Sequence, residues 1–137
     1  MKDLEFLEQV INEKAAMILD ANDKIWEYAE LAFHETKSAA LLCDILEKEG
    51  FTLTTGDAGI PTCFTATFSY GSGKPVMGIL GEYDALSSLS QKAAATTKEP
   101  LIEGAPGHGC GHCALGTGSL SAALEVKEYL VANKKDG

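Results

Sequence analysis

The chain has 137 residues, of which 45% are hydrophobic and 23% charged, and its formal net charge is -9. This length suits about one domain, and the composition is that of a globular protein rather than a disordered chain. The negative charge argues against nucleic acid or an anionic membrane surface as a partner. The acidic start lacks the basic end and apolar run of a signal peptide, and no apolar run reaches the roughly eighteen residues of a membrane span, so we expect a cytoplasmic protein.

The first fifty residues have the apolar spacing of helices. A helical stripe runs over residues 4–18. Turn and capping residues follow it, namely Asp20, Asn22 and Asp23. They predict that this helix ends there and that a short second helix covers residues 24–30. A third helix is predicted over residues 36–48, with Gly50 as its C-terminal stop.

The periodicity then changes to that of strands. Three β-branched or apolar runs, separated by Gly, Asp and Pro, predict strands at residues 51–55, 61–68 and 75–82. The turn at residues 70–74 is long enough to join the second and third runs as a hairpin. The third run is apolar throughout residues 76–81, which predicts a central strand covered on both faces.

A long segment without periodicity precedes the last helix. Residues 85–111 are rich in Ser, Ala, Thr, Gly and Pro, and a loop of this length is usually functional or mobile. Helical spacing returns over residues 114–131. Three helices, three strands, a long loop and a helix predict an α/β fold with an incomplete sheet, ending where such a fold would place its next strand.

The densest chemical signal is the string GHGCGHC at residues 107–113, with two histidines and two cysteines among glycines. Cys110 and His112 are two residues apart, so an extended or turning backbone can direct both side chains to one side. The dipole of the following helix favours the thiolate of Cys110, which is the metal-binding form. An incidental glycine-rich loop is the plainer interpretation, but four such side chains in one window favour a metal site.

A pair of acids ends the predicted central strand. Glu82 and Asp84 are two residues apart, so on a strand they share a face. The carboxyl ends of strands are where open α/β sheets form their sites, although a solvated strand end is an equally good interpretation of these acids alone. Together with the Cys/His string they predict a metal site.

This predicted site is incomplete. Thiolate and imidazole suit zinc, and carboxylates also suit manganese or cobalt. A bound metal lowers the pKa of its water to roughly 7, which yields a hydroxide for amide hydrolysis. A general base is missing from the motifs, and His34, beside Glu35, is expected to be an exposed helix-end residue.

The motifs resemble a known family, the metal-dependent amidohydrolases of the aminoacylase/carboxypeptidase type, and most closely the aminobenzoyl-glutamate utilisation protein B branch. The resemblance spans residues 11–131, the N-terminal portion of such an enzyme. It rests on the segments ELAF at 30–33 with Glu35, GSGKP at 71–75, GEYDAL at 81–86 and GAPGHGCGH at 104–112.

The resemblance implies a two-metal hydrolase, with zinc or manganese, that cleaves an acyl-amino acid or dipeptide-like substrate. Cys110 and His112 match the metal-binding Cys-x-His of the family, and Glu82 occupies a position where related members place a ligand. Asp84 matches the catalytic aspartate that orients a ligand. His108 is either a ligand or a residue that contacts one.

The resemblance also implies parts that this sequence does not contain. Residues 1–137 would be a partial catalytic domain, without its C-terminal half, its paired glutamates or the inserted dimerisation domain. Ser87 replaces the usual proline after Asp-Ala-Leu, and Cys113 replaces the usual Asp or Asn after Cys-Gly-His. We therefore expect a second polypeptide or a homo-oligomer to complete the site, or a fragment without activity of its own.

A third function is thiol–disulfide exchange. Cys110 and Cys113 form a Cys-x-x-Cys at a helix N-terminus, which is a suitable setting for redox chemistry. A thioredoxin-like fold needs further strands and another helix after the motif, and Gly109 stands where a tryptophan is expected. The sequence therefore favours the hydrolase.

Overall fold

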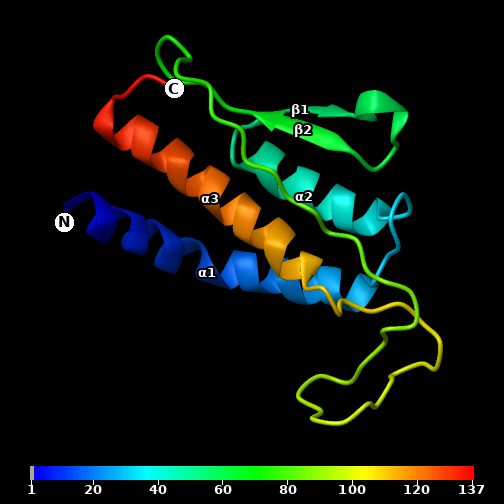
Figure 1. Cartoon of the computed structure of the whole chain (residues 1–137). Helices are drawn as coiled ribbons and strands as arrows, with labels where there is room; N and C mark the ends of the chain where they lie inside the picture. Colours follow the sequence, from blue (N-terminus) through cyan, green and yellow to red (C-terminus); the bar gives the residue numbers. More distant parts are fainter. Residues whose placement is uncertain (1) are drawn as a thin grey trace.

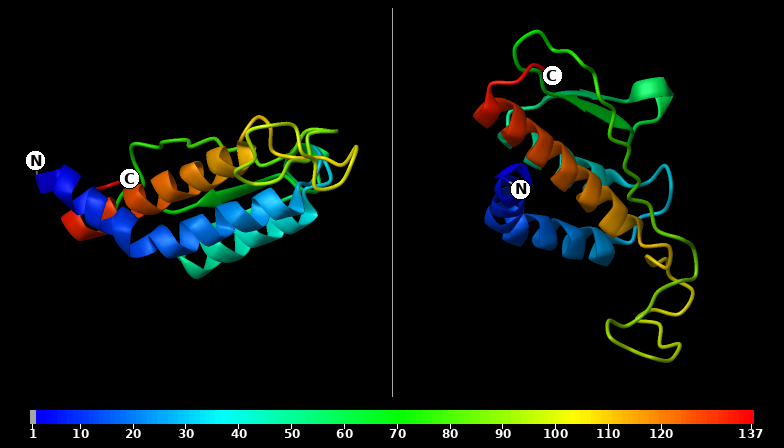
Figure 2. Two further views of the ribbon diagram at one scale, coloured as in Figure 1. Left: turned by 90° about the horizontal axis from the view of Figure 1, so that it is seen from below. Right: turned by 60° about the vertical axis from the view of Figure 1, so that its left-hand side comes forward.

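The structure, a computed structural model that describes residues 2–137, consists of three helices and a two-stranded antiparallel sheet (Figure 1). The elements are α1 (Lys2–Tyr28), α2 (Thr36–Lys48), β1 (Thr52–Thr55), a short 3-10 turn η1 (Asp57–Gly59), β2 (Phe64–Thr67) and α3 (His112–Asn133). The helices pack together, the β-hairpin lies over α2, and the loop before α3 projects beyond the start of that helix (Figures 1 and 2). None of the helices within residues 2–137 has the length and apolar character needed to cross a bilayer.

The first helix is continuous, so the predicted break at residues 20–23 is wrong. Ala21 and Ile25 are fully buried and continue the apolar stripe through that region. Asp20 accepts a hydrogen bond from Lys24 one turn later, at 2.6 Å, which supports the helix from its exposed side. Packing of the apolar stripe therefore overrides the turn preference of the Asp and Asn residues.

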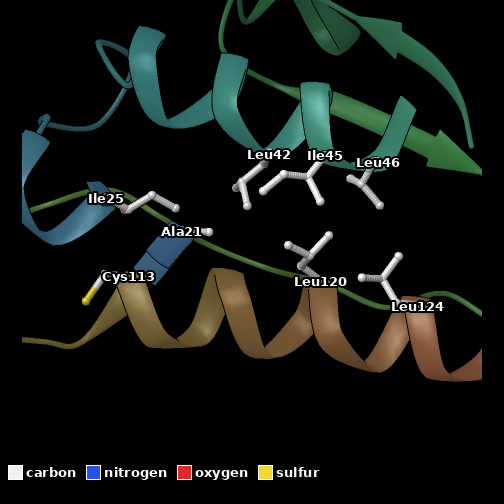
Figure 3. Close-up of a cluster of buried hydrophobic side chains, with 8 residues drawn as sticks. All are labelled: Ala21, Ile25, Leu42, Ile45, Leu46, Cys113, Leu120 and Leu124. Atoms are coloured by element: carbon white, nitrogen blue, oxygen red, sulfur yellow. The ribbon is translucent and has the colours of Figure 1, made fainter. Parts of the chain in front are cut away.

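The core lies where the three helices meet (Figure 3). It is formed by Ala21 and Ile25 of α1, Leu42, Ile45 and Leu46 of α2, and Cys113, Leu120 and Leu124 of α3. Each fully buried aliphatic side chain contributes roughly 1.5–3 kcal/mol to folding. This contact fixes α3, and therefore its first residue, His112, relative to the other two helices.

The sheet is smaller than predicted, and its hairpin is a different one. β1 pairs with β2 from Thr52 opposite Thr67 to Thr55 opposite Phe64. The turn at residues 70–74 does not join two strands. The second predicted strand is present as β2, and the third, at residues 75–82, does not form.

The third run is instead an extended segment beside α3 (Figures 1 and 2). Within the described chain it has no paired strand, and Val76 and Leu80 are 86% and 84% exposed. A groove of about 700 Å³ separates it from β2, with mostly apolar side chains of α2 and α3 along its floor. An apolar sequence predicts a buried strand only where neighbouring strands exist to cover it.

The start of α2 is capped by a residue that precedes it in the chain. Glu35, at the N-cap position, makes no side-chain capping bond. The carboxylate of Glu30 instead accepts hydrogen bonds from the backbone N–H groups of Lys37 and Ser38, at 2.9–3.1 Å. The hydroxyls of Thr36 and Ser38 also donate to it. Glu30 thus ties the end of α1 to the start of α2.

Replacing Glu30 by Gln should lower the free energy of unfolding at pH 7 by about 1 kcal/mol, as for other lost caps. Burial raises the pKa of Glu30, but the N–H and hydroxyl donors outweigh this effect and the pKa is lowered. The stabilisation is therefore complete above the unfolded-state pKa of about 4.3 and is lost as the pH falls through the lower folded-state value.

Urea denaturation of wild type and Glu30→Gln at pH 7 and pH 3 measures this difference. Glu8→Gln is the matched control, because Glu8 is exposed on α1 and makes no side-chain hydrogen bond or ion pair with the rest of residues 2–137. Equal losses for the two variants would contradict the capping role.

Candidate metal centre

The two segments that carry the predicted site residues converge at the end of α1. The backbone N–H of Ala85 donates to Glu30 O at 2.7 Å, which fixes the end of the extended stretch at residues 75–84 that carries Glu82 and Asp84, here called the acidic segment. The long loop then closes on itself, since Leu86 and Gly107 exchange both backbone hydrogen bonds at 3.0 Å. The Cys/His string therefore begins beside the acids, although the loop between them extends away from the helices (Figure 1).

Closure of the loop requires a glycine at position 107. A Cβ atom there would lie 2.0 Å from the carbonyl oxygen of Leu89 and 2.8 Å from the backbone nitrogen of Ser90. Both atoms belong to the backbone, so neither moves aside as a side-chain tip would. Gly107, the first glycine of the string, thus allows two backbone segments to pack closely, and this role does not involve an ion.

The centre itself consists of Glu82, Asp84 and His112, whose ligand atoms lie within 4.8 Å of one another. Asp84 Oδ1 lies 2.6 Å from His112 Nδ1, and Glu82 Oε2 lies 3.1 Å from His112 Nε2. The His112 and Asp84 side chains are about 18% and 22% exposed, whereas Glu82 is 54% exposed. Both ring nitrogens of one histidine thus face carboxylate oxygens.

A neutral His112 ring has too few N–H groups to donate to both carboxylates. A neutral imidazole carries a single N–H, and an ionised carboxylate only accepts hydrogen bonds. With the N–H directed at Asp84, the Nε2 lone pair faces the oxygen of Glu82, an unfavourable pairing of two electron-rich atoms that either a second proton on the ring or a cation between them would relieve.

The donor set fits a divalent cation. Two ligands about 2.0–2.1 Å from one zinc ion are roughly 3 Å apart, which is close to the separation of His112 Nε2 and Glu82 Oε2. The contact of Asp84 with Nδ1 is the carboxylate–histidine pairing that orients a metal-bound imidazole. Imidazole and carboxylate suit zinc or manganese.

His108 precedes His112 in the same string and is anchored to α1. Its Nε2 is 3.0 Å from the carbonyl oxygen of Ile25, so this nitrogen must carry the hydrogen. Burial lowers the pKa of His108. In the neutral ring, Nδ1 then offers a lone pair, and this atom is buried without a hydrogen-bond partner in the described part of the chain. His108 is thus available as a ligand but lies outside the three-residue cluster.

The two cysteines of the string differ in environment. Cys110 is exposed, and its sulfur is not part of the group formed by Glu82, Asp84 and His112, so its ligation stays a prediction. Cys113 is buried in the helical core, and burial raises the pKa of its thiol. His34 is exposed, as expected.

Tyr83, which the sequence motifs did not single out, anchors the acidic segment from its other side. Its hydroxyl donates to the carbonyl oxygen of Thr62, and its ring stacks on Phe64 of β2 at 6.0 Å. The Thr62 hydroxyl donates in turn to the buried Glu35, at 2.7 Å. Burial raises the pKa of Tyr83, so the hydroxyl stays a donor. Side chains alternate along an extended chain, so the sequence could have indicated that Tyr83 points away from Glu82 and Asp84.

Substituting Gly107 by Ala should disrupt the base of the loop and lower the free energy of unfolding by about 1–3 kcal/mol, as overpacking does. Gly78→Ala is the matched control, because a Cβ at Gly78 meets nothing within 4 Å. Urea denaturation measures the free energy, and limited proteolysis reports cleavage within residues 86–107. A Gly107→Ala protein as stable and as resistant as Gly78→Ala would show that this close approach is unimportant.

Comparison with known proteins identifies a clear relative. A p-aminobenzoyl-glutamate hydrolase subunit of Escherichia coli (strain K12) is 43% identical over 125 residues. The alignment covers 91% of this chain and 26% of the relative, so the chain spans about a quarter of the relative's length. No family model matches the chain. The identity confirms the resemblance that the sequence motifs predicted.

Proposed function

Because the chain belongs to the amidohydrolase family represented by that relative, we propose that it supplies part of the metal site of an enzyme that hydrolyses amide bonds. The substrate class is an N-acyl amino acid or a small peptide-like molecule, and p-aminobenzoyl-glutamate, named in the relative, is the first candidate. The observation that carries the proposal is the contact of both His112 nitrogens with the carboxylates of Glu82 and Asp84.

In this proposal His112 and Glu82 hold a divalent cation, zinc or manganese, and Asp84 orients the His112 ring. Cys110 and His108 are further candidate ligands, and two ions are expected in the complete enzyme. When bound, the cation supplies an acidified water and polarises the amide carbonyl. The negative charge of the two carboxylates attracts the cation, and the buried contact of Asp84 keeps the imidazole in one orientation.

We further propose that the chain corresponds to part of a catalytic domain, and that strands outside this sequence complete its sheet. Two features support this: the chain matches about a quarter of its relative, and the apolar segment at residues 75–82 faces β2 across an unfilled groove. A second polypeptide or a second copy of the chain would then bring the remaining site residues.

The redox function has less support. Cys113 is buried in the helical core, and burial raises the pKa of its thiol, so the exposed Cys110 would have to supply the thiolate that disulfide exchange requires. Thiol titration and zinc binding of Cys113→Ser separate the two functions. In our proposal Cys113 is not a ligand of the cation. Zinc binding should therefore survive Cys113→Ser.

Glu82→Gln and Asp84→Asn should each weaken zinc binding by about 10–100-fold, the usual effect of losing a ligand or its carboxylate partner. Competition with a chromophoric chelator at pH 7 measures the dissociation constant. Glu103→Gln is the control, since Glu103 is an exposed loop acid without a side-chain partner in residues 2–137. Zinc binding that is equally strong in all three variants would refute this centre.

The purified 137-residue chain, loaded with zinc or manganese, should hydrolyse p-aminobenzoyl-glutamate below detection, because its sequence lacks the paired glutamates that the resemblance implies as the source of the general base. Absorbance of released p-aminobenzoate measures turnover. Turnover near the 1–10³ s⁻¹ typical of enzymes would contradict the proposal that the site is completed from outside this chain.

A further inference from the structure

One face of α3 lies against the acidic segment. His112, Gly116 and Ser119 follow one another at intervals of four and three residues, so they share a side of the helix. Ser119 Oγ donates to the carbonyl oxygen of Leu80 at 2.8 Å. One turn nearer the helix start, Gly116 is buried beneath the backbone of Glu82. At the helix start, His112 lies between the two carboxylates.

The fit at Gly116 leaves no room for a side chain. A Cβ atom there would lie 2.9 Å from the carbonyl oxygen of Glu82 and 3.2 Å from Cβ of Tyr83. The nearest atom is backbone, so an added methyl group must displace the segment or the helix. Gly118, two residues later, has nothing within 4 Å of its Cβ position.

We propose that Gly116 is a positioning residue of the metal centre: its missing side chain sets the distance between the acidic segment and α3, and thereby the distances from Glu82 and Asp84 to His112. This inference rests on the proposed function, since the distances matter most if His112 and Glu82 bind one cation and Asp84 orients His112.

The segment has few other attachments that could set this distance. Among residues 2–137, no backbone–backbone hydrogen bond involves the stretch from residue 75 to residue 84. Besides the contacts of Glu82 and Asp84 with His112, it is held by the Ser119–Leu80 bond, by the Tyr83 hydroxyl on Thr62 and ring on Phe64, and by the Ala85–Glu30 bond beyond its end. The helix is fixed by Leu120 and Leu124 in the core, so the segment, rather than α3, should yield to an added methyl group.

A small displacement is sufficient to harm the centre. Metal–ligand distances in proteins vary by only about 0.2 Å, and the side chains of a binding site must stay within about 0.5 Å of their productive positions. An ordinary methyl–oxygen contact is longer than the 2.9 Å available at Gly116, and Glu82 is itself the residue whose carbonyl is displaced. Its carboxylate would move with it.

The test uses the full 137-residue chain as wild type, Gly116→Ala and Gly118→Ala. Both substitutions place Ala in the same helix, but only the first meets backbone atoms. Zinc affinity is measured by competition with a chromophoric chelator, and folding by far-UV circular dichroism and thermal melting without metal. We expect at least a tenfold loss of zinc affinity in Gly116→Ala and none in Gly118→Ala.

Two further measurements separate positioning from simple destabilisation. Ser119→Ala removes the attachment at Leu80 without adding volume and should weaken zinc binding less than Gly116→Ala does. In a Glu82→Gln background, Gly116→Ala should weaken zinc binding by a much smaller factor than in wild type, because the displaced ligand is already lost. An equal loss in both backgrounds would show a structural effect only and overturn the inference.

The metal-free chain distinguishes this inference from the proposed function. The ring carbon-bound protons of His112 should shift in the NMR spectrum of Gly116→Ala and remain in place in Gly118→Ala. If wild type binds no zinc, the proposed metal site fails, while the His112 shift still supports the positioning role. Unchanged His112 resonances in a folded Gly116→Ala protein would overturn that role.

Discussion

The backbone hydrogen bond from Ala85 to Glu30, at 2.7 Å, is the constraint on which the candidate site depends. It places the end of the acidic segment at the C-terminal end of α1, where His108 also attaches through the carbonyl oxygen of Ile25. The acidic segment and the Cys/His string, which a long loop separates, thus meet at the C-terminal end of α1. Glu30 also caps α2 through its side chain, so this short junction links α1, α2 and the end of the segment that carries the two acids.

The same helix serves the core and the centre. One side of α3 contributes Leu120 and Leu124 to the contact among the helices, and another side presents His112 to the carboxylates. His112 is therefore held by packing that extends over several turns. The acidic segment, in contrast, has no strand beside it in the described structure, and its placement depends on a few side-chain contacts and on close backbone approach.

Features that local chemistry determines could be predicted from the sequence. The bounds of α2 agree with the helix expected at residues 36–48, and the Glu82/Asp84 pair does approach the Cys/His string. Prediction failed where tertiary contacts decide the outcome. Burial of Ala21 and Ile25 carries α1 through its predicted break, and the apolar run at residues 75–82 lacks the neighbours that would make it a strand.

The contacts of Tyr83 and Gly116 were also beyond prediction, because they join residues far apart in the chain. Alternation could indicate that Tyr83 faces away from the two acids but not that it contacts Thr62, and a glycine inside a helix does not indicate its partner. By contrast, the glycine-rich string could be recognised as a whole, although Gly107 proves to serve loop closure. Sequence patterns thus indicated which segments meet, and packing determined which of their residues lie close together.

The claim that His112 and Glu82 hold a cation, with Asp84 orienting the His112 ring, is tested most directly by zinc K-edge X-ray absorption of the zinc-loaded chain. The account predicts imidazole scattering together with oxygen ligands at about 2.0–2.2 Å. A shell dominated by two sulfurs at about 2.3 Å, without imidazole, would instead place the ion on the cysteine pair and contradict the account.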